Sequence, residues 1–293
     1  MSNFITTAFV NEFRDNVMLL SQQRMSRLRN AVRVENFTGE KAFFDQLAPT
    51  VMQAVTTRHS DTPLIETKHE RRMVVAKEYA WADLIDRGDV ARTLPDFTNP
   101  YLVNAAAAVG RTFDTILINA ADGIAKTGKE GGTNTALPAG NIIPNTVGAN
   151  TGLNTAKLLR AKFLLDQAEV DPSIPRFVCA NATQMENLLQ DNQVQSSDYN
   201  IVKALVSGEI SQWLGFNFIR TELIRTVSTD HRVLFWAQDG LLLGINYDVE
   251  ARVTERDDKN YAIQPYLRMM AGATRMEESK VGVITCAVTP AAT

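Results

Sequence analysis

The chain has 293 residues, of which 45% are hydrophobic and 22% charged, and its formal net charge is −3 at pH 7. At roughly 100–200 residues per domain, this length allows one large domain or two smaller ones. The composition is that of a folded, soluble protein and excludes global disorder and collagen-like repeats. The small net charge excludes a whole-chain field strong enough to capture nucleic acid or an anionic membrane.

The cysteines and the N-terminus bear on the compartment. Cys179 and Cys286 lie far apart in apolar stretches, which favours two buried thiols in a reducing compartment over one disulfide. The first residues lack the features of a signal peptide, and no apolar run is long enough to span a membrane. We therefore expect a protein made and kept in a cytoplasm-like environment, without a membrane partner.

Residues 3–33 predict an amphipathic helical arm. Phe9, Phe13, Val17 and Leu20 recur at helical spacing and form one apolar stripe. Five arginines minus two acidic residues leave this segment a local charge of +3. The charged face is either simply solvated, or it docks on a partner subunit or faces an enclosed polyanion.

Between residues 34 and 92 the helical period fades. Pro49 and Pro63 interrupt the pattern, and apolar β-branched residues predict mostly β-structure with long connections. Residues 58–92 carry seven basic and seven acidic side chains. This dense, balanced mixture suits a surface that pairs with another charged surface, although a solvated hairpin fits equally well. The candidate inter-subunit charge contacts are Lys68, Glu70, Arg71, Arg72, Lys77 and Glu78.

The strongest helix signal begins near residue 98. Thr98 or Asn99 can cap it, with Pro100 at the first helical position, and apolar residues repeat every three or four positions up to residue 124. A helix of about 25 residues would be nearly 40 Å long. Four alanines at 105–108 allow close approach of a crossing segment, and Gly128 is expected to end the helix.

Residues 127–152 carry no period and predict a long loop or a change of domain. After it, residues 153–225 predict a compact α+β unit. Its expected elements are a helix over 154–168, a buried strand over 175–181, a helix from 183 with Thr183 and Glu186 in capping-box spacing, a helix over 197–210 and a strand over 215–224.

The tail over 232–288 is rich in predicted strands, with breaks at 239–240 and 257–260. Val249, Ala251 and Val253 alternate with polar residues before the second break, which predicts a hairpin with one buried face. These strands must pair with earlier parts of the chain.

The residues provide no constellation for catalysis. The histidines at 59, 69 and 231 are few and scattered, and His69 begins an H-E-x-x-H pattern in which Met73 replaces the second histidine. The segment 128–133 lacks the spacing of a phosphate-binding loop. We therefore expect no catalytic residue, no metal and no cofactor. A cytoplasmic enzyme with 127–152 as an active-site lid is the rival interpretation.

The order of these elements resembles the major capsid protein of tailed bacteriophages, with the Hong Kong 97-like fold. Residues 68–89 (KHERRMVVAKEYAWADLIDRGD) look like the strand that leaves its extended loop, and 99–123 like its long spine helix. The stretch 170–224, with S-x-D-Y-N and L-G-F segments, looks like its axial domain, and 269–287 (MMAGATRMEESKVGVITCA) like its closing strands. The similarity covers about 34 to 288.

The resemblance implies an α+β fold with four parts. They are an N-terminal arm (1–33), an extended β-hairpin loop (34–80), a peripheral domain (81–135 and 230–293) that contains the spine helix, and an inserted axial domain (136–229).

The resemblance also implies a structural function without catalysis. Hexamers and pentamers of the chain would form an icosahedral shell around double-stranded DNA, which the shell would meet only non-specifically. A portal at one vertex and a separate scaffolding protein are expected, because only about 33 residues precede the loop. The shell would assemble in the bacterial host cytoplasm and reside in the virion. Lys68 and Lys77 lie where some relatives crosslink, but no motif assigns their partners. A portal or tail protein is the rival within the virion.

Overall fold

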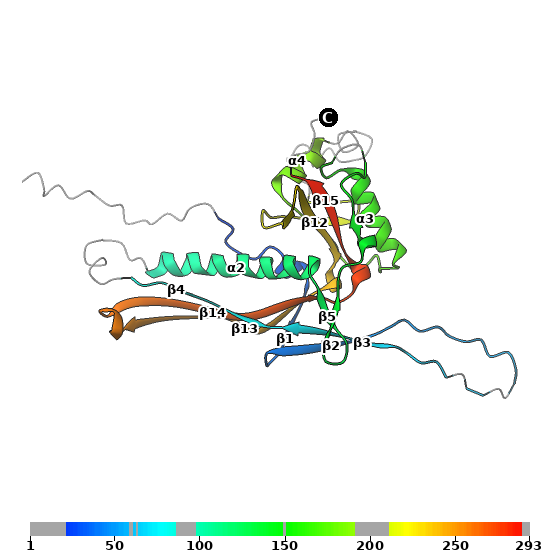
Figure 1. Ribbon diagram of the computed structural model, residues 1–293, viewed down its shortest axis with the longest axis horizontal. Helices are drawn as coiled ribbons and strands as arrows, with labels where there is room; N and C mark the ends of the chain where they lie inside the picture. The colour runs from blue at the N-terminus through cyan, green and yellow to red at the C-terminus, as the bar shows by residue number, and fades with distance from the viewer. Residues whose placement is uncertain are drawn as a thin grey trace, which may run out of the picture. The chain divides into compact units, whose positions relative to one another are not determined.

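The computed structural model describes residues 22–58, 61, 62, 64–85, 98–148, 151–190 and 211–288, and within them the chain is a mixed α+β protein (Figure 1). The helices are α2 (Thr98–Asp122), α3 (Thr155–Gln167) and α4 (Ala182–Gln190). The strands up to residue 143 are β1 (Arg33–Asn36), β2 (Lys41–Leu47), β3 (His69–Val75), β4 (Lys77–Ala82), β5 (Ala125–Thr127), β6 (Thr133–Thr135) and β7 (Ile142–Ile143). The later strands are β8 (Arg176–Ala180), β9 (Gln212–Trp213), β10 (Phe216–Arg220), β11 (Thr226–Val227), β12 (Asp230–Ala237), β13 (Leu241–Arg256), β14 (Ala262–Arg275) and β15 (Val281–Ala287).

The chain forms two compact units. One comprises Met1–Ser26, Glu78–Thr112 and Tyr247–Met270, and the other comprises Arg27–Lys77, Phe113–Asn246 and Ala271–Thr293. The helix predicted over 197–210 and most of the predicted helical arm lie outside the described residues. The predicted division into arm, extended loop, peripheral domain and axial domain stays a prediction.

Helix α2 confirms the long predicted helix but differs from it at both ends. It begins at Thr98, so Pro100 lies inside the first turn, and it ends at Asp122 instead of Gly128. Arg275 donates to the carbonyls of Ala121 and Gly123, which satisfies groups that an ending helix leaves open. From Ala125 onward the chain pairs as β5, so the helix cannot continue.

A crossing segment was predicted to approach α2 closely at its four alanines. The close approach occurs beside them, at Gly110. A Cβ placed on Gly110 would lie 2.7 Å from the backbone nitrogen of Ser26, which is too close for any side chain. The end of the N-terminal segment therefore packs directly against the helix backbone at this position.

The larger unit contains a seven-stranded sheet in the order β7-β15-β12-β8-β10-β9, with β11 beside β12. β8 and β10 run parallel, and β12 is antiparallel to both β8 and β15. α3 and α4 pack on this sheet (Figure 1). Fully buried members of the shared core are Leu158, Leu165, Val178, Leu188, Phe216, Val233, Phe235 and Ile284. Cys179 and Cys286 are buried free thiols, as predicted.

The helix caps in this unit match the prediction once and depart from it once. Asn154 caps α3 by accepting a hydrogen bond from the backbone of Lys157, close to the predicted start. For α4 the predicted capping box of Thr183 and Glu186 is wrong: the side chain of Asn181 accepts from the backbone of Gln184 at 3.0 Å. Asparagine is as effective a cap as threonine, and here the earlier residue takes the role.

The segment 127–152, predicted as a long loop or a change of domain, is not a continuous loop. It contains β6, a short 3-10 turn over Ala139–Asn141, and β7. β6 pairs with β5, and β7 pairs with β15. The glycines and prolines of this segment lie in or beside turns. The short strands between them form by pairing with β5 and β15, which a local sequence pattern does not predict.

The predicted buried face of the β13–β14 hairpin is buried on β14, at Pro265, Leu267 and Met269, but not on β13. Val249 and Val253 are 43% and 48% exposed. Alternation defines two unlike faces of a strand, but it does not say whether a second layer covers the apolar face. This half of the hairpin is left with apolar side chains that face solvent in the single subunit.

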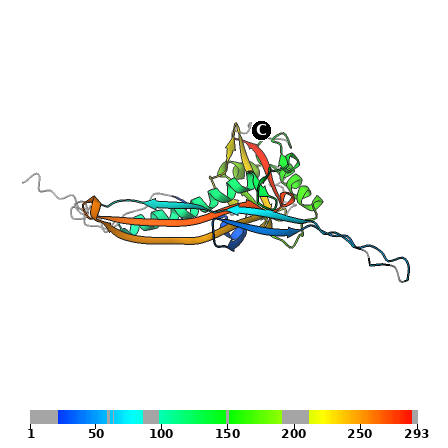
Figure 2. The same ribbon diagram turned by 60° about the horizontal axis from the view of Figure 1, so that its bottom comes forward.

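A third sheet has the order β2-β3-β5-β6. β2 and β3 are antiparallel over seven residues, from the pair Lys41 and Val75 to the pair Leu47 and His69. Figure 2 shows them side by side where they lead into the segment 48–68, which contains no strand among its described residues. The larger unit therefore carries a two-stranded ribbon that continues into an irregular loop, and the predicted bounds of 34–80 for this loop stay a prediction.

Candidate functional site

Three of the charged candidates from the sequence, Glu70, Arg71 and Arg72, lie together on β3 where the chain leaves the extended loop. Side chains on a strand alternate between faces, so neighbouring charges on β3 point in opposite directions. Arg71 lies on one face of the β2–β3 ribbon, and Arg72 and Glu70 lie on the other. The two arginines consequently have different partners.

Arg71 is held on the outer face by the opposite strand. Its guanidinium donates two hydrogen bonds to the Asp45 carboxylate, at 2.5 and 3.1 Å, and lies over the ring of Phe43. The hydrogen bonds from Arg71 hold the pKa of Asp45 below its ordinary value. Both side chains are substantially exposed, so this bidentate pair orients charge at the surface and adds little to stability.

Arg72 points inward and pairs with a distant residue. Its two terminal nitrogens donate to the two oxygens of Glu278 at 2.7 Å each, and the Arg72 side chain is only 4% exposed. Glu70, which is largely exposed, approaches the same guanidinium at 3.8 Å. The buried Arg72 charge requires the Glu278 carboxylate, because removing either side chain would leave the other charge buried without a counter-ion.

Glu278 serves a second buried arginine. Arg275 lies 3.5 Å from the Glu278 carboxylate and is fully buried. It also donates to the carbonyls of Ala121 and Gly123 at the end of α2, and to Thr135 of β6. Strand β3, which leaves the extended loop, is therefore connected through Arg72, Glu278 and Arg275 to the end of the long helix.

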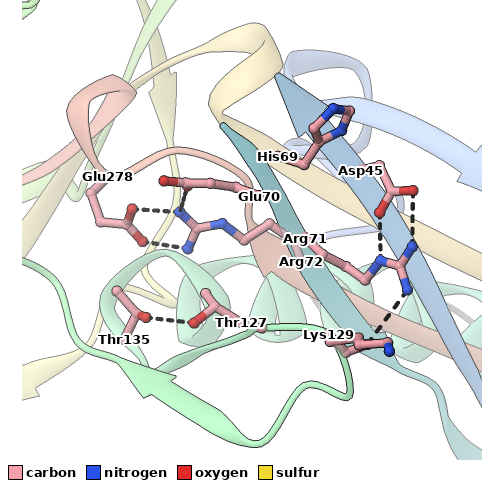
Figure 3. A pocket seen from close by; sticks show the side chains of 10 residues that line it. Asp45, His69, Glu70, Arg71, Arg72, Thr127, Lys129, Thr135 and Glu278 are labelled. Carbon is pink, nitrogen blue, oxygen red and sulfur yellow. Dashed lines mark hydrogen bonds and ion pairs between the residues drawn. The ribbon is translucent and has the colours of Figure 1, made fainter. Parts of the chain in front are cut away.

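A polar pocket of about 570 Å³ lies between these groups (Figure 3). Figure 3 shows Arg72 and Glu278 meeting on one side of β3, and Arg71 and Asp45 on the other. Thr127 and Thr135 share a hydrogen bond at 3.0 Å at its floor, and Lys129 lies at its rim. The pocket is lined by charges of both signs, most of them already paired, which is typical of a contact surface and unlike a site that activates a nucleophile.

The six predicted contact residues divide into two groups. The structure brings Glu70, Arg71 and Arg72 together at the pocket. Lys68, Lys77 and Glu78 are exposed and form no ion pair within the described part of the chain. Arg71 and Arg72 both form ion pairs within the subunit, and of the two only Arg72 is buried.

Sequence reasoning missed Asp45, Phe43 and Glu278. The alternation in KAFFDQL could have placed Phe43 and Asp45 on one face of a strand. No local signal could have found Glu278, because 206 positions separate it from Arg72.

Metal-holding clusters and membrane-spanning helices are both absent from the described residues. Over these ranges, no three His, Cys, Asp or Glu side chains are grouped so that they could hold a metal ion. No helix among them is long and apolar enough to cross a membrane.

The fold is that of a phage capsid subunit. The chain is similar to the capsid of the cyanophage P-SCSP1u, at 18% identity over 97% of this chain and 95% of that chain, with a TM-score of 0.76. It is also similar to the capsid of Ralstonia phage GP4 (10%, covering 96% of each chain, TM-score 0.75) and of the cyanophage Pam1 (12%, covering 97% and 98%, TM-score 0.73). No curated protein sequence matches the chain.

Residues 5–288 match the family described as phage capsid protein, and the chain belongs to this family. Its fold is the Hong Kong 97-like fold of tailed-phage major capsid proteins, and its role is that of a structural subunit of a phage shell. The rival interpretation as an enzyme with a lid over 127–152 is wrong.

Proposed function

We propose that many copies of this chain, arranged as hexamers and pentamers, form an icosahedral shell that encloses the double-stranded DNA of a tailed bacteriophage. The extended loop lies on a neighbouring copy. A separate scaffolding protein directs assembly in the host cytoplasm, and a portal occupies one vertex. The small net charge of −3 fits a shell that surrounds DNA without holding it tightly.

The exposure of the loop is the observation that carries this proposal. Met52 and Leu64 are 95% and 96% exposed, and Val51, Val55 and Leu47 are each about two-thirds exposed or more. Single exposed apolar residues are common, but such a concentration in one excursion is typical of an interaction surface. The loop has too little chain of its own to cover these side chains, whereas a neighbouring copy could cover them.

The exposed charges support the same contact. Lys68 and Glu70 are exposed where β3 leaves the loop, and Lys77 and Glu78 are exposed at the start of β4. Mixed charges of this kind fix the register of two surfaces and disfavour wrong partners. Repeating one modest contact around a closed shell then gives an avidity that no single contact has.

The four-part division belongs to this proposal. The arm (1–33) and the extended loop (34–80) serve contacts, the peripheral domain (81–135 and 230–293) meets neighbouring capsomers, and the axial domain (136–229) meets its copies at capsomer centres. β12 and β15 from the last segment pair in one sheet with β8 and β7, so the axial and peripheral segments share a core.

Deleting the loop tests the proposal. A variant in which residues 50–66 are replaced by two glycines should retain the fold, because the ribbon pairs β2 and β3 up to Leu47 and His69. We expect it to stay unassembled on a large-pore column and by negative-stain microscopy, while the wild type forms shells or capsomer rings. Normal particles from the deletion variant would contradict the role of the loop.

A pair of double variants separates the effect of the apolar side chains on assembly from the effect of the loop length. Met52→Gln with Leu64→Gln removes the two most exposed apolar groups, and Thr56→Gln with Thr62→Gln is the matched control on the same segment. The first pair should reduce assembly and the control should not. Equal particle yields from the two pairs would show that apolar burial does not drive the contact.

A further inference from the structure

β2 is an edge strand whose outer side has no strand partner in the described residues. It occupies one end of the sheet order β2-β3-β5-β6. An edge strand presents a row of N–H and C=O groups that can pair with another strand. Such an edge is a template for a further strand unless something covers it.

The hydrogen bonds that flank the ribbon show which groups point outward. Ala48 donates to the carbonyl of Lys68 at 3.0 Å, and Ala76 donates to the carbonyl of Glu40 at 2.9 Å. In an antiparallel pair, hydrogen-bonded positions alternate, so residues 42, 44 and 46 also face β3. The N–H and C=O groups of Lys41, Phe43, Asp45 and Leu47 therefore point to the open edge.

A groove of about 660 Å³ runs beside this edge. Five consecutive residues, 45–49, line it, although side chains of consecutive strand residues point to opposite faces. Glu70 and Arg72 of β3 also line it, so the groove covers the inner face of the β2–β3 ribbon and reaches the edge of β2 at residues 45–47. Its other wall is formed by residues 276–280 with Arg33 and Asp239.

The groove is lined by charges of both signs, and each carboxylate lies in an ion pair, Asp45 with Arg71 and the others with Arg72, Arg275 or Lys280. Its lining includes Asp45, Glu70, Asp239, Glu277 and Glu278, five carboxylates against the three cations Arg33, Arg72 and Lys280. An occupant that adds no further acidic group leaves these ion pairs undisturbed.

We propose that the open edge of β2 receives an extended segment of a second copy of this chain, which adds to the sheet as a further strand. The inference rests on the proposed assembly into a shell and names the surface that the assembly would use. Backbone pairing of this kind supplies affinity along the whole strand, while the groove selects the occupant.

Residues 50–57 of the neighbouring copy fit the edge best among the described segments. They lie outside any strand, are exposed, and include β-branched residues at 50, 51, 55, 56 and 57, which favour extended pairing. They carry no acidic side chain, and Arg58 follows them. Repeated head-to-tail, this contact would form the ring of a capsomer where the rotation between copies closes.

Hydrogen exchange of the wild-type protein tests the edge directly. In the free subunit, the amides of residues 42, 44 and 46 should exchange slowly and those of residues 43, 45 and 47 quickly. In purified assembled particles, the second set and the amides of 50–57 should both slow down. Particles in which residues 43, 45 and 47 still exchange quickly would overturn the proposal, and protection of this edge without protection of 50–57 would overturn the named donor.

A proline pair tests the same edge through assembly. Leu47→Pro removes an outward N–H and leaves the ladder to β3 intact, whereas Leu47→Ala removes only the side chain. Since one lost backbone hydrogen bond weakens a contact about fivefold, and the contact repeats around the shell, we expect Leu47→Pro to lower particle yield by more than about fivefold relative to Leu47→Ala. Equal thermal midpoints of the two subunits would confirm that both fold.

The outcomes separate this inference from the proposed function. If the wild type forms particles and Leu47→Pro matches Leu47→Ala in yield, the β2 edge is not used and the shell function stands. If the wild type remains monomeric at high concentration and alongside scaffolding protein, both fail.

Discussion

Replacing Glu278 by glutamine removes the carboxylate that two buried arginines share. Arg72 is bound by both oxygens at 2.7 Å, and Arg275 lies 3.5 Å away. The Nε atoms of both arginines are buried and have no hydrogen-bond partner among the described residues. The Glu278 carboxylate is therefore the main counter-ion of two buried arginines.

The magnitude follows from this sharing. Removing one partner of a buried ion pair typically costs about 3–5 kcal/mol, because it leaves the other charge uncompensated. We expect Glu278→Gln to lower the free energy of unfolding by this amount. Arg72→Met should cost less, about 2 kcal/mol, because the Glu278 carboxylate retains Arg275 and only charged hydrogen bonds are lost.

Urea unfolding of the free subunit measures both effects through the fluorescence of Trp236, which is buried in the same unit. Asp45→Asn, which breaks the exposed pair with Arg71, serves as the control and should leave the midpoint near that of the wild type. An Arg72→Met variant as destabilised as Glu278→Gln, or both within error of the control, would refute the shared-carboxylate argument.

Three further predictions concern other buried groups. Asp114→Ala removes the acceptor for the backbone N–H groups of residues 27 and 28 and should destabilise this contact by about 2 kcal/mol, seen as faster tryptic cleavage within 22–28. Burial raises the pKa of Cys286 to about 12 and that of Cys179 further, so neither thiol should react with an alkylating reagent at pH 8 until the subunit unfolds; rapid labelling of the native protein would contradict this. Burial lowers the pKa of Lys157 below 10.5, so between the lowered pKa and pH 10.5 the unfolded chain binds more protons than the folded chain, and stability should rise with pH in this window. Lys157→Met should abolish this rise. A variant with the same pH profile as the wild type would contradict the prediction.

The sequence by itself was sufficient for elements that repeat a local period. The long helix over Thr98–Asp122, the helix after Asn154 and the buried strand around Val178 all follow from the spacing of apolar residues. The ordered set of these elements also identified the capsid family and its fold. Composition was enough to exclude a polyelectrolyte, because net charge does not depend on folding.

At the candidate site the sequence predicted the region but not the arrangement. It placed Arg71 and Arg72 together among contact residues, yet the strand turns one outward to Asp45 and the other inward to Glu278. Alternation could have separated the two arginines onto opposite faces. It could not have supplied Glu278, which comes from the turn before β15.

Tertiary structure alone decided burial, partners and free edges. The sequence predicts that the apolar face at Val249 and Val253 is buried, but it is exposed in the subunit. The sequence predicts a strand at β2, but not that β2 lies at the edge of its sheet. The physical reason is the same in each case. A periodic pattern records which side chains favour burial and which backbone conformation they share, whereas the layer that covers a face, the ion that neutralises a charge and the strand that pairs with an edge come from residues far away in the chain.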